Sequence, residues 1–254
     1  MPTSLESGLW DATARVCFSG FSTLYDELSA SFREAAETIW FQYYRESVDK
    51  IPSSARKARE EIKRRFLEAP FYKQYEFVEF CLGAVTPPGE ADIFCNVLND
   101  LLRRELAAFR VADCQFIQVS NEIELEEVTA AIASVGGGVR EHISAAARYY
   151  SAIPNPDYRN SIKESISAVE SAVAHVCGGK PNGVSKKLRD AQDRLHIHPA
   201  LWQGFEKLYS YTSDAGGIRH ALIEGDRQPS QEDAKYMLVS CSAFSNFLIS
   251  KATS

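Results

Sequence analysis

Apolar residues recur every three or four positions along most of this chain, which is the spacing of an amphipathic helix. The pattern is clearest in residues 55–68, 157–177 and 231–251. In the last segment the apolar residues occupy more than one face, as in a central helix or a helix at a dimer interface. The predicted helices are 24–48, 55–68, 72–83, 90–107, 122–135, 139–151, 157–177, 184–196, 199–212 and 231–251, with a short helix that begins near Arg219.

One stretch follows the alternating pattern of β-strands instead. Residues 109–119 contain two apolar–polar segments on either side of Ala112-Asp113-Cys114, which predicts a small hairpin. The turn lacks the glycine that such turns usually contain. We therefore expect a mainly α fold, with a C-terminal antiparallel helical bundle and an α-rich N-terminal domain that contains the hairpin.

Three consecutive glycines, at 136–138, interrupt the helical pattern and predict a domain boundary. The N-terminal domain then comprises residues 1–136 and the bundle comprises residues 139–254. Charge differs between the two parts: residues 139–254 contain 14 basic and 12 acidic side chains, and the rest of the chain contains 14 and 22. This asymmetry indicates different roles for the two domains.

The composition is typical of a soluble globular protein, with 254 residues, 45% hydrophobic and 24% charged. No apolar run approaches the length of a membrane-spanning helix, and the N-terminus lacks a secretory pattern, so we expect a cytoplasmic protein that does not contact membranes. The six cysteines occur singly and the five histidines form no metal-binding motif. We therefore expect no disulfide framework, no metal and no other cofactor.

The segment around Gly217 is the clearest candidate for chemistry, because it opens a helix with Arg219 and His220 in the first turn. Unpaired backbone N–H groups at a helix N-terminus attract phosphate, and an arginine adds a bidentate contact. A histidine can take the proton of an RNA 2′-hydroxyl near neutral pH. The same residues also suit a purely structural helix start, in which Arg219 pairs with Asp214 or Glu224.

A second polar cluster lies at the start of helix 157–177. Arg159, Asn160 and Glu164 follow Asp157 and leave a polar face opposite the apolar one. These residues either line the same phosphate-binding cleft as Arg219 or form a salt-bridge network that stabilises the bundle. His142 and His175 are interpreted as ordinary helix residues.

Several segments of the chain resemble the AbiJ-like abortive-infection proteins. They are Asn155–Glu170, His198–Leu201, Leu208–Asp214, Gly217–His220 and Asp233–Phe244, with a looser match around Tyr75–Phe80 and the hairpin. The resemblance implies a C-terminal HEPN-type domain, which is an all-α and usually dimeric bundle common among antiphage ribonucleases. The family theme is bacterial defence, in which the RNA of an infected cell is attacked.

The sequence departs from the general HEPN pattern at one point. Catalytic members commonly carry an arginine and a histidine separated by four to six residues, of which the first is polar, whereas His220 directly follows Arg219. The positions where that histidine is expected contain Glu224, Gly225 and Asp226. Arg189 and His196 satisfy the spacing, but they lie outside the matching segments.

Together these features predict an antiphage abortive-infection component that acts on RNA as a metal-independent endoribonuclease toxin, with Arg219 and His220 as catalytic residues. The residues expected to bind phosphate or to support them are Arg159, Asn160, Glu164, Asp214 and Gly217. The alternative is a non-catalytic HEPN module that dimerises, binds nucleotide or RNA, or holds a partner toxin. A third hypothesis is the neutralising partner of a two-protein toxin–antitoxin system. The expected partners are RNA or a nucleotide, a second copy in a homodimer, and a partner defence protein.

Overall fold

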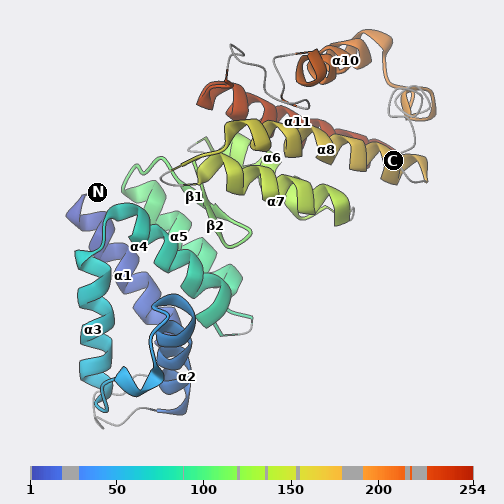
Figure 1. Cartoon of the computed structure of the whole chain (residues 1–254). Helices are drawn as coiled ribbons and strands as arrows, with labels where there is room; N and C mark the ends of the chain where they lie inside the picture. Colours follow the sequence, from blue (N-terminus) through green and yellow to red (C-terminus); the bar gives the residue numbers. More distant parts are fainter. Residues whose placement is uncertain are drawn as a thin grey trace. The chain divides into compact units, whose positions relative to one another are not determined.

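The computed structural model of the chain describes residues 2–18, 29–87, 89–118, 121–134, 137–152, 155–178, 191–214, 218 and 228–253. The described residues are mainly helical and include one small hairpin (Figure 1), which confirms the predicted fold class. The chain divides into two compact units, Met1–Phe116 and Ile117–Ser254.

The first unit contains five α-helices among its described residues, together with shorter helical turns and the hairpin. The helices are α1 (Thr3–Cys17), α2 (Ala30–Thr38), α3 (Ala55–Glu68), α4 (Phe71–Phe80) and α5 (Ala91–Arg104). The turns are η1 (Ile39–Tyr43), η2 (Val48–Lys50) and η3 (Cys81–Val85), and the strands are β1 (Arg110–Ala112) and β2 (Gln115–Ile117). Helix α1 has no counterpart among the predicted helices.

Local sequence explains where these helices begin and end. The Ser54 hydroxyl accepts the backbone N–H of Lys57 at 3.3 Å, which caps the start of α3, and Pro70 follows its end. The predicted helix 24–48 is wrong at its C-terminal end, since its described part stops with the π-helical turn η1 at Tyr43. Arg45 then adopts a φ of 55°, which a right-handed helix does not contain.

Aromatic side chains form much of the core of the first unit. Trp10 on α1 is 1% exposed, and its ring centroid lies 5.8 Å from that of Phe66 and 6.0 Å from that of Phe18. Phe18 in turn packs edge-on against Phe32 at 5.5 Å. Helix α1, which the sequence pattern did not predict, thus supplies the ring at the centre of this group.

The hairpin is confirmed, and its turn has an unusual composition. Asp113 and Cys114 both have positive φ angles, 48° and 60°, in a position where glycine or asparagine is favoured. Side chains from neighbouring helices compensate by bonding the strands: Asn99 exchanges two hydrogen bonds with the backbone of Val111, and Glu79 accepts the N–H of Phe116 at 2.6 Å. The tertiary contacts thus hold a turn that its own sequence does not favour.

In the second unit, all the described elements that follow the hairpin are helices. They are α6 (Glu122–Ile132), α7 (Gly137–Ser151), α8 (Tyr158–Cys177), α10 (Pro199–Asp214) and α11 (Gln231–Thr253). The predicted short helix at Arg219 and most of the predicted helix 184–196 lie outside the described residues.

Helices α7 and α8 form an antiparallel pair. The last turn of α7 meets the first turn of α8 where the rings of Tyr150 and Tyr158 lie 6.1 Å apart. At the other end, a Cβ atom added to Gly138 would lie 3.0 Å from the Ser171 hydroxyl, so the two backbones approach closely there. This register decides which polar side chains of the two helices meet.

Helix α6 packs with the second unit. Glu124 pairs with Lys235 of α11 at 2.7 Å, and the Asn246 amide donates to the Glu127 carboxylate at 2.8 Å. The compact units accordingly divide between Phe116 and Ile117, ahead of α6. The predicted domains, residues 1–136 and 139–254, stay a prediction.

Candidate functional site

The structure describes part of the polar constellation that the sequence predicts in the second unit. Gly217, Arg219 and His220 lie outside the described residues, as does the side chain of Asp214 at the end of α10. Arg159, Asn160 and Glu164 lie in the first two turns of α8. A shared cleft between these α8 residues and Arg219 therefore stays a prediction.

Asp157 and Asn160 bond to each other at the start of α8. One carboxylate oxygen of Asp157 accepts the backbone N–H of Asn160 at 3.0 Å, and the other accepts its side-chain amide at 2.7 Å. This is an N-cap, which satisfies backbone donors that the helix itself leaves unpaired. The pair therefore stabilises the beginning of α8, in agreement with the structural interpretation of Asn160.

Glu164 has a partner that the sequence did not suggest. Its carboxylate lies 2.7 Å from Nδ1 of His142 on α7, and the two side chains are 21% and 36% exposed. A carboxylate at Nδ1 orients the imidazole and leaves Nε2 as the nitrogen that can exchange a proton with a substrate. The residues are 22 positions apart on different helices, so only the antiparallel register of α7 and α8 brings them together.

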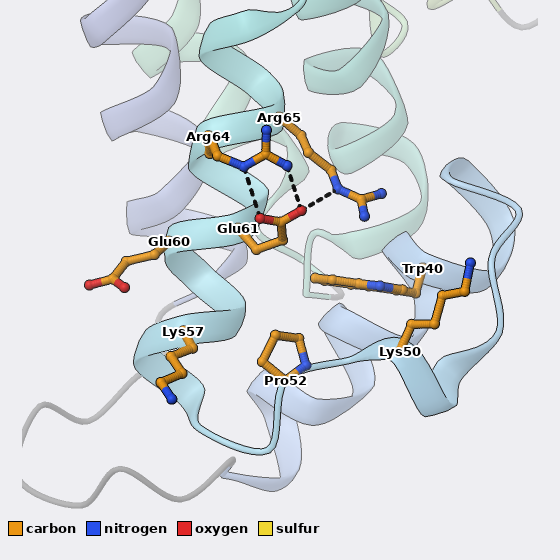
Figure 2. Close-up of a pocket in the computed structure, with 8 residues that line it drawn as sticks. All are labelled: Trp40, Lys50, Pro52, Lys57, Glu60, Glu61, Arg64 and Arg65. Atoms are coloured by element: carbon orange, nitrogen blue, oxygen red, sulfur yellow. Dashed lines mark hydrogen bonds and ion pairs between the residues drawn. The ribbon is translucent and has the colours of Figure 1, made fainter.

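A pocket with a volume of about 390 Å³ lies in the first unit (Figure 2). It is lined by Trp40, Lys50, Pro52, Lys57, Glu60, Glu61, Arg64 and Arg65. These residues come from η1, from η2 and the loop that follows it, and from α3. The cationic side chains outnumber the anionic ones, although the N-terminal part of the chain as a whole is acidic.

Two adjacent arginines of α3 converge on one carboxylate in this pocket. Arg64 donates to Glu61 through Nε at 3.0 Å and Nη2 at 2.7 Å, and Arg65 donates to it through Nε at 2.8 Å. The hydrogen bonds from Arg64, followed by those from Arg65, lower the pKa of Glu61 to about 2. Glu61 therefore stays ionised over the physiological pH range and keeps both guanidinium groups in place (Figure 2).

Arg65 is oriented further by contacts beyond α3. It donates to Glu46 through both terminal nitrogens, at 2.9 and 3.4 Å. Its guanidinium carbon lies 4.4 Å from the ring centroid of Tyr44 and 5.7 Å from that of Trp40. Carboxylates and aromatic faces together hold this guanidinium in one orientation.

No sequence pattern predicted this pocket. Residues 55–68 are predicted as a helix, and in isolation a helix with so many charged side chains is typical of an exposed one. The adjacent Arg64 and Arg65, with lysines on both sides of Pro52, were the available signal. These residues form a pocket only because η1 and η2 place Trp40 and Lys50 beside α3. Hydrophobic periodicity does not predict η1 or η2.

In the described ranges, no helix is both long and apolar enough to cross a membrane. No group of three His, Cys, Asp or Glu side chains in those ranges is arranged to hold a metal ion.

The fold and sites define a mainly α protein with two compact units, one of which carries a cationic pocket. The model of the family described as AbiJ N-terminal domain 4 matches residues 1–134. That match covers more than half of the chain, and the protein belongs to this family. The predicted AbiJ-like relationship is thereby confirmed, and it associates the chain with abortive-infection defence. Comparison with curated proteins and with solved structures finds no match.

Proposed function

We propose that this chain is an antiphage abortive-infection component whose second unit is a HEPN-type bundle that cleaves RNA without a metal ion. Arg219 and His220 are the proposed catalytic pair. The defence role rests on the family. The RNA-cleaving step is supported by one observation on the described residues, the contact between His142 and Glu164.

The His142–Glu164 contact provides a group suited to proton transfer. A carboxylate 2.7 Å from Nδ1 orients the ring and leaves Nε2 as the nitrogen that can exchange a proton with a substrate. The imidazole is partly exposed, so an RNA backbone can reach it. In this proposal Glu164, predicted from the sequence as a supporting residue, orients the His142 ring.

The proposed reaction is an intramolecular transesterification of RNA. His220 takes the proton of a 2′-hydroxyl while that oxygen attacks the neighbouring phosphorus, and Arg219 balances the developing negative charge. The 5′-oxygen leaves with a proton donated by Nε2 of His142. The products are a 2′,3′-cyclic phosphate on one fragment and a 5′-hydroxyl on the other.

Expression in bacteria and cleavage of RNA by the purified chain test this function. We expect growth arrest with the unchanged protein, and its loss with Arg219→Ala and with His220→Ala. Cleavage by His142→Ala should fall on the order of a hundredfold, because general acid–base groups contribute about that much or more. His175→Ala is the matched control, since His175 is exposed on α8 and has no role in the proposal. Intact RNA after incubation with the unchanged protein would exclude the nuclease.

The spacing of Arg219 and His220 favours a second candidate function. Adjacent residues on a helix point about 100° apart, an arrangement that differs from the usual HEPN motif. The second unit would then be a non-catalytic HEPN module that dimerises, binds RNA or a nucleotide, or holds a partner toxin. Binding of RNA without cleavage, retained in His220→Ala, would identify this function.

A further inference from the structure

We propose that the pocket formed by η1, η2 and α3 binds the phosphate group of a small molecule. The site lies in the first unit and is separate from the proposed RNA chemistry of the second. Its volume, about 390 Å³, is in the range of small-molecule sites, about 300–1,000 Å³. Trp40, which is 1% exposed, and Pro52 supply its apolar wall, and charged side chains surround it (Figure 2).

Several hydrogen-bond donors of the pocket have no partner among the described residues. An arginine side chain has five N–H donors. Arg64 uses three of its donors on Glu61 and Glu68, and Arg65 uses three on Glu61 and Glu46. Each guanidinium group therefore keeps two donors for a ligand.

The lysines of the pocket add further donors. The Lys50 ammonium lies 3.6 Å from Glu46, a carboxylate that Arg65 already occupies with two hydrogen bonds, and the Lys50 side chain is 65% exposed. The Lys57 ammonium group has no ion-pair partner among the described residues. In Figure 2 the Lys57 side chain extends outward from α3, at the rim of the pocket.

Trp40 contributes one more unused donor. Its indole Nε1 is buried and has no hydrogen-bond acceptor among the described residues. A buried N–H without an acceptor is unfavourable, and most such groups in folded proteins are paired.

The two carboxylates that line the pocket already have cationic partners, and Glu60 pairs with Arg56 at 3.1 Å through one oxygen. Glu61 receives three hydrogen bonds from the two arginines, and its pKa of about 2 shows how strongly they hold its charge. The unused groups are thus donors, and most of them are cationic. A matching ligand must provide several acceptor oxygens and negative charge.

Phosphate fits these groups better than a carboxylate does. A phosphate ester carries up to three free oxygens and close to two negative charges near neutral pH, whereas a carboxylate has two oxygens and one charge. The remaining guanidinium donors and the lysine ammonium groups suit charge-assisted hydrogen bonds with phosphate oxygens. The apolar wall at Pro52 leaves room for an organic group attached to the phosphate. Free phosphate and a nucleoside monophosphate are the two sources that share this chemistry.

Isothermal titration of the full chain tests the site. Inorganic phosphate and adenosine monophosphate serve as probes, and adenosine serves as the probe without phosphate. We expect saturable binding of a phosphate-containing probe and none of adenosine. Lys50→Gln together with Lys57→Gln should weaken binding on the order of tenfold, the effect of losing a charge-assisted hydrogen bond. Neither lysine has a hydrogen-bonded role in the core, so the fold should be retained.

Two matched controls define the result. Lys63→Gln removes the same charge from an exposed position of α3 outside the pocket, and it should leave the affinity unchanged. His175→Ala, which changes an exposed residue of the second unit, should also leave it unchanged. Tighter binding of adenosine monophosphate than of phosphate identifies an ester as the ligand, and equal affinities identify phosphate itself. Absence of saturable binding by both probes, or equal weakening by Lys63→Gln, would overturn the proposal.

Discussion

The two units of this protein differ in the balance of side chains that they bury, since rings are more frequent in the core of the first and buried serines occur in the second. Trp10, Trp40 and Phe32 are among the largest fully buried side chains of the first unit. The second unit places small residues between its helices. Ala146, Ala168, Ala172, Ser161, Ser165 and Ser245 are all completely buried there.

This difference affects what each unit can bind. Rings of different orientation pack around α1, and another buried ring of the unit, Trp40, forms the wall of a pocket beside a charged helix surface. Small side chains let helices approach closely, as at Gly138 and Ser171, and bring polar groups on their outer faces within hydrogen-bonding distance. The first unit therefore offers a concave cationic site, and the second offers polar pairs between helices, of which His142 and Glu164 are one.

The largest expected effect concerns the aromatic core. Trp10→Ala should lower the free energy of unfolding of the first unit by about 3–5 kcal/mol, because it leaves a large cavity against Phe18 and Phe66. Urea unfolding followed by circular dichroism measures the change. Phe41→Ala is the control, since Phe41 is 70% exposed and should change stability by no more than about 0.5 kcal/mol. Equal losses for the two variants would contradict the packing around α1.

A smaller effect is expected when a large side chain enters the small-residue core. Ala168→Leu should destabilise the second unit by about 1–3 kcal/mol, because Ala168 is fully buried and close-packed helices must separate to admit the added atoms. Ser242→Ala provides the comparison at a buried position of α11. Its hydroxyl has no hydrogen-bond partner in the described part of the chain, so its removal should be neutral or slightly stabilising. The same urea experiment distinguishes the two results.

The smallest effect is the pH dependence of the Glu61 ion pairs. Since the pKa of Glu61 in the folded protein, about 2, lies below the ordinary value of 4.5, its contribution is fully present above pH 4.5 and is lost as the pH falls toward 2. The contribution is small because Arg64 is 52% and Glu61 27% exposed, and water and salt screen the pair. The stability difference between the unchanged protein and Glu61→Gln should therefore be larger at about pH 6 than at about pH 3. A difference that grows on acidification would contradict the arrangement in Figure 2.

The sequence predicted those elements whose signals are local. Helix α3 begins after Ser54 and ends before Pro70, as expected, because a side-chain cap and a proline act on neighbouring residues. Helix α8 likewise follows the cap at Asp157 and ends at Gly178, which has a φ of 70°. The apolar periodicity between those ends also identified the buried face of α8, including Ile162 and Ile166.

The sites depended on contacts that no local pattern describes. Trp40 and Arg65 meet because η1 and α3 fold against each other, and His142 meets Glu164 because α7 and α8 have one particular register. Helix α1 illustrates the same limit in the core, since Trp10 is buried by rings that lie far from it in the chain. The predicted catalytic residues Arg219 and His220 lie outside the described residues, and their role stays a proposal.

By itself, then, the sequence determined the helical class, the hairpin and most helix boundaries, because caps, prolines, glycines and periodicity act over a few residues. Its resemblance to AbiJ-like proteins also identified the family. The tertiary structure alone decided which charges face one another and where a pocket forms. The physical reason is that such contacts join residues distant in sequence, and their geometry is set by the packing of whole helices.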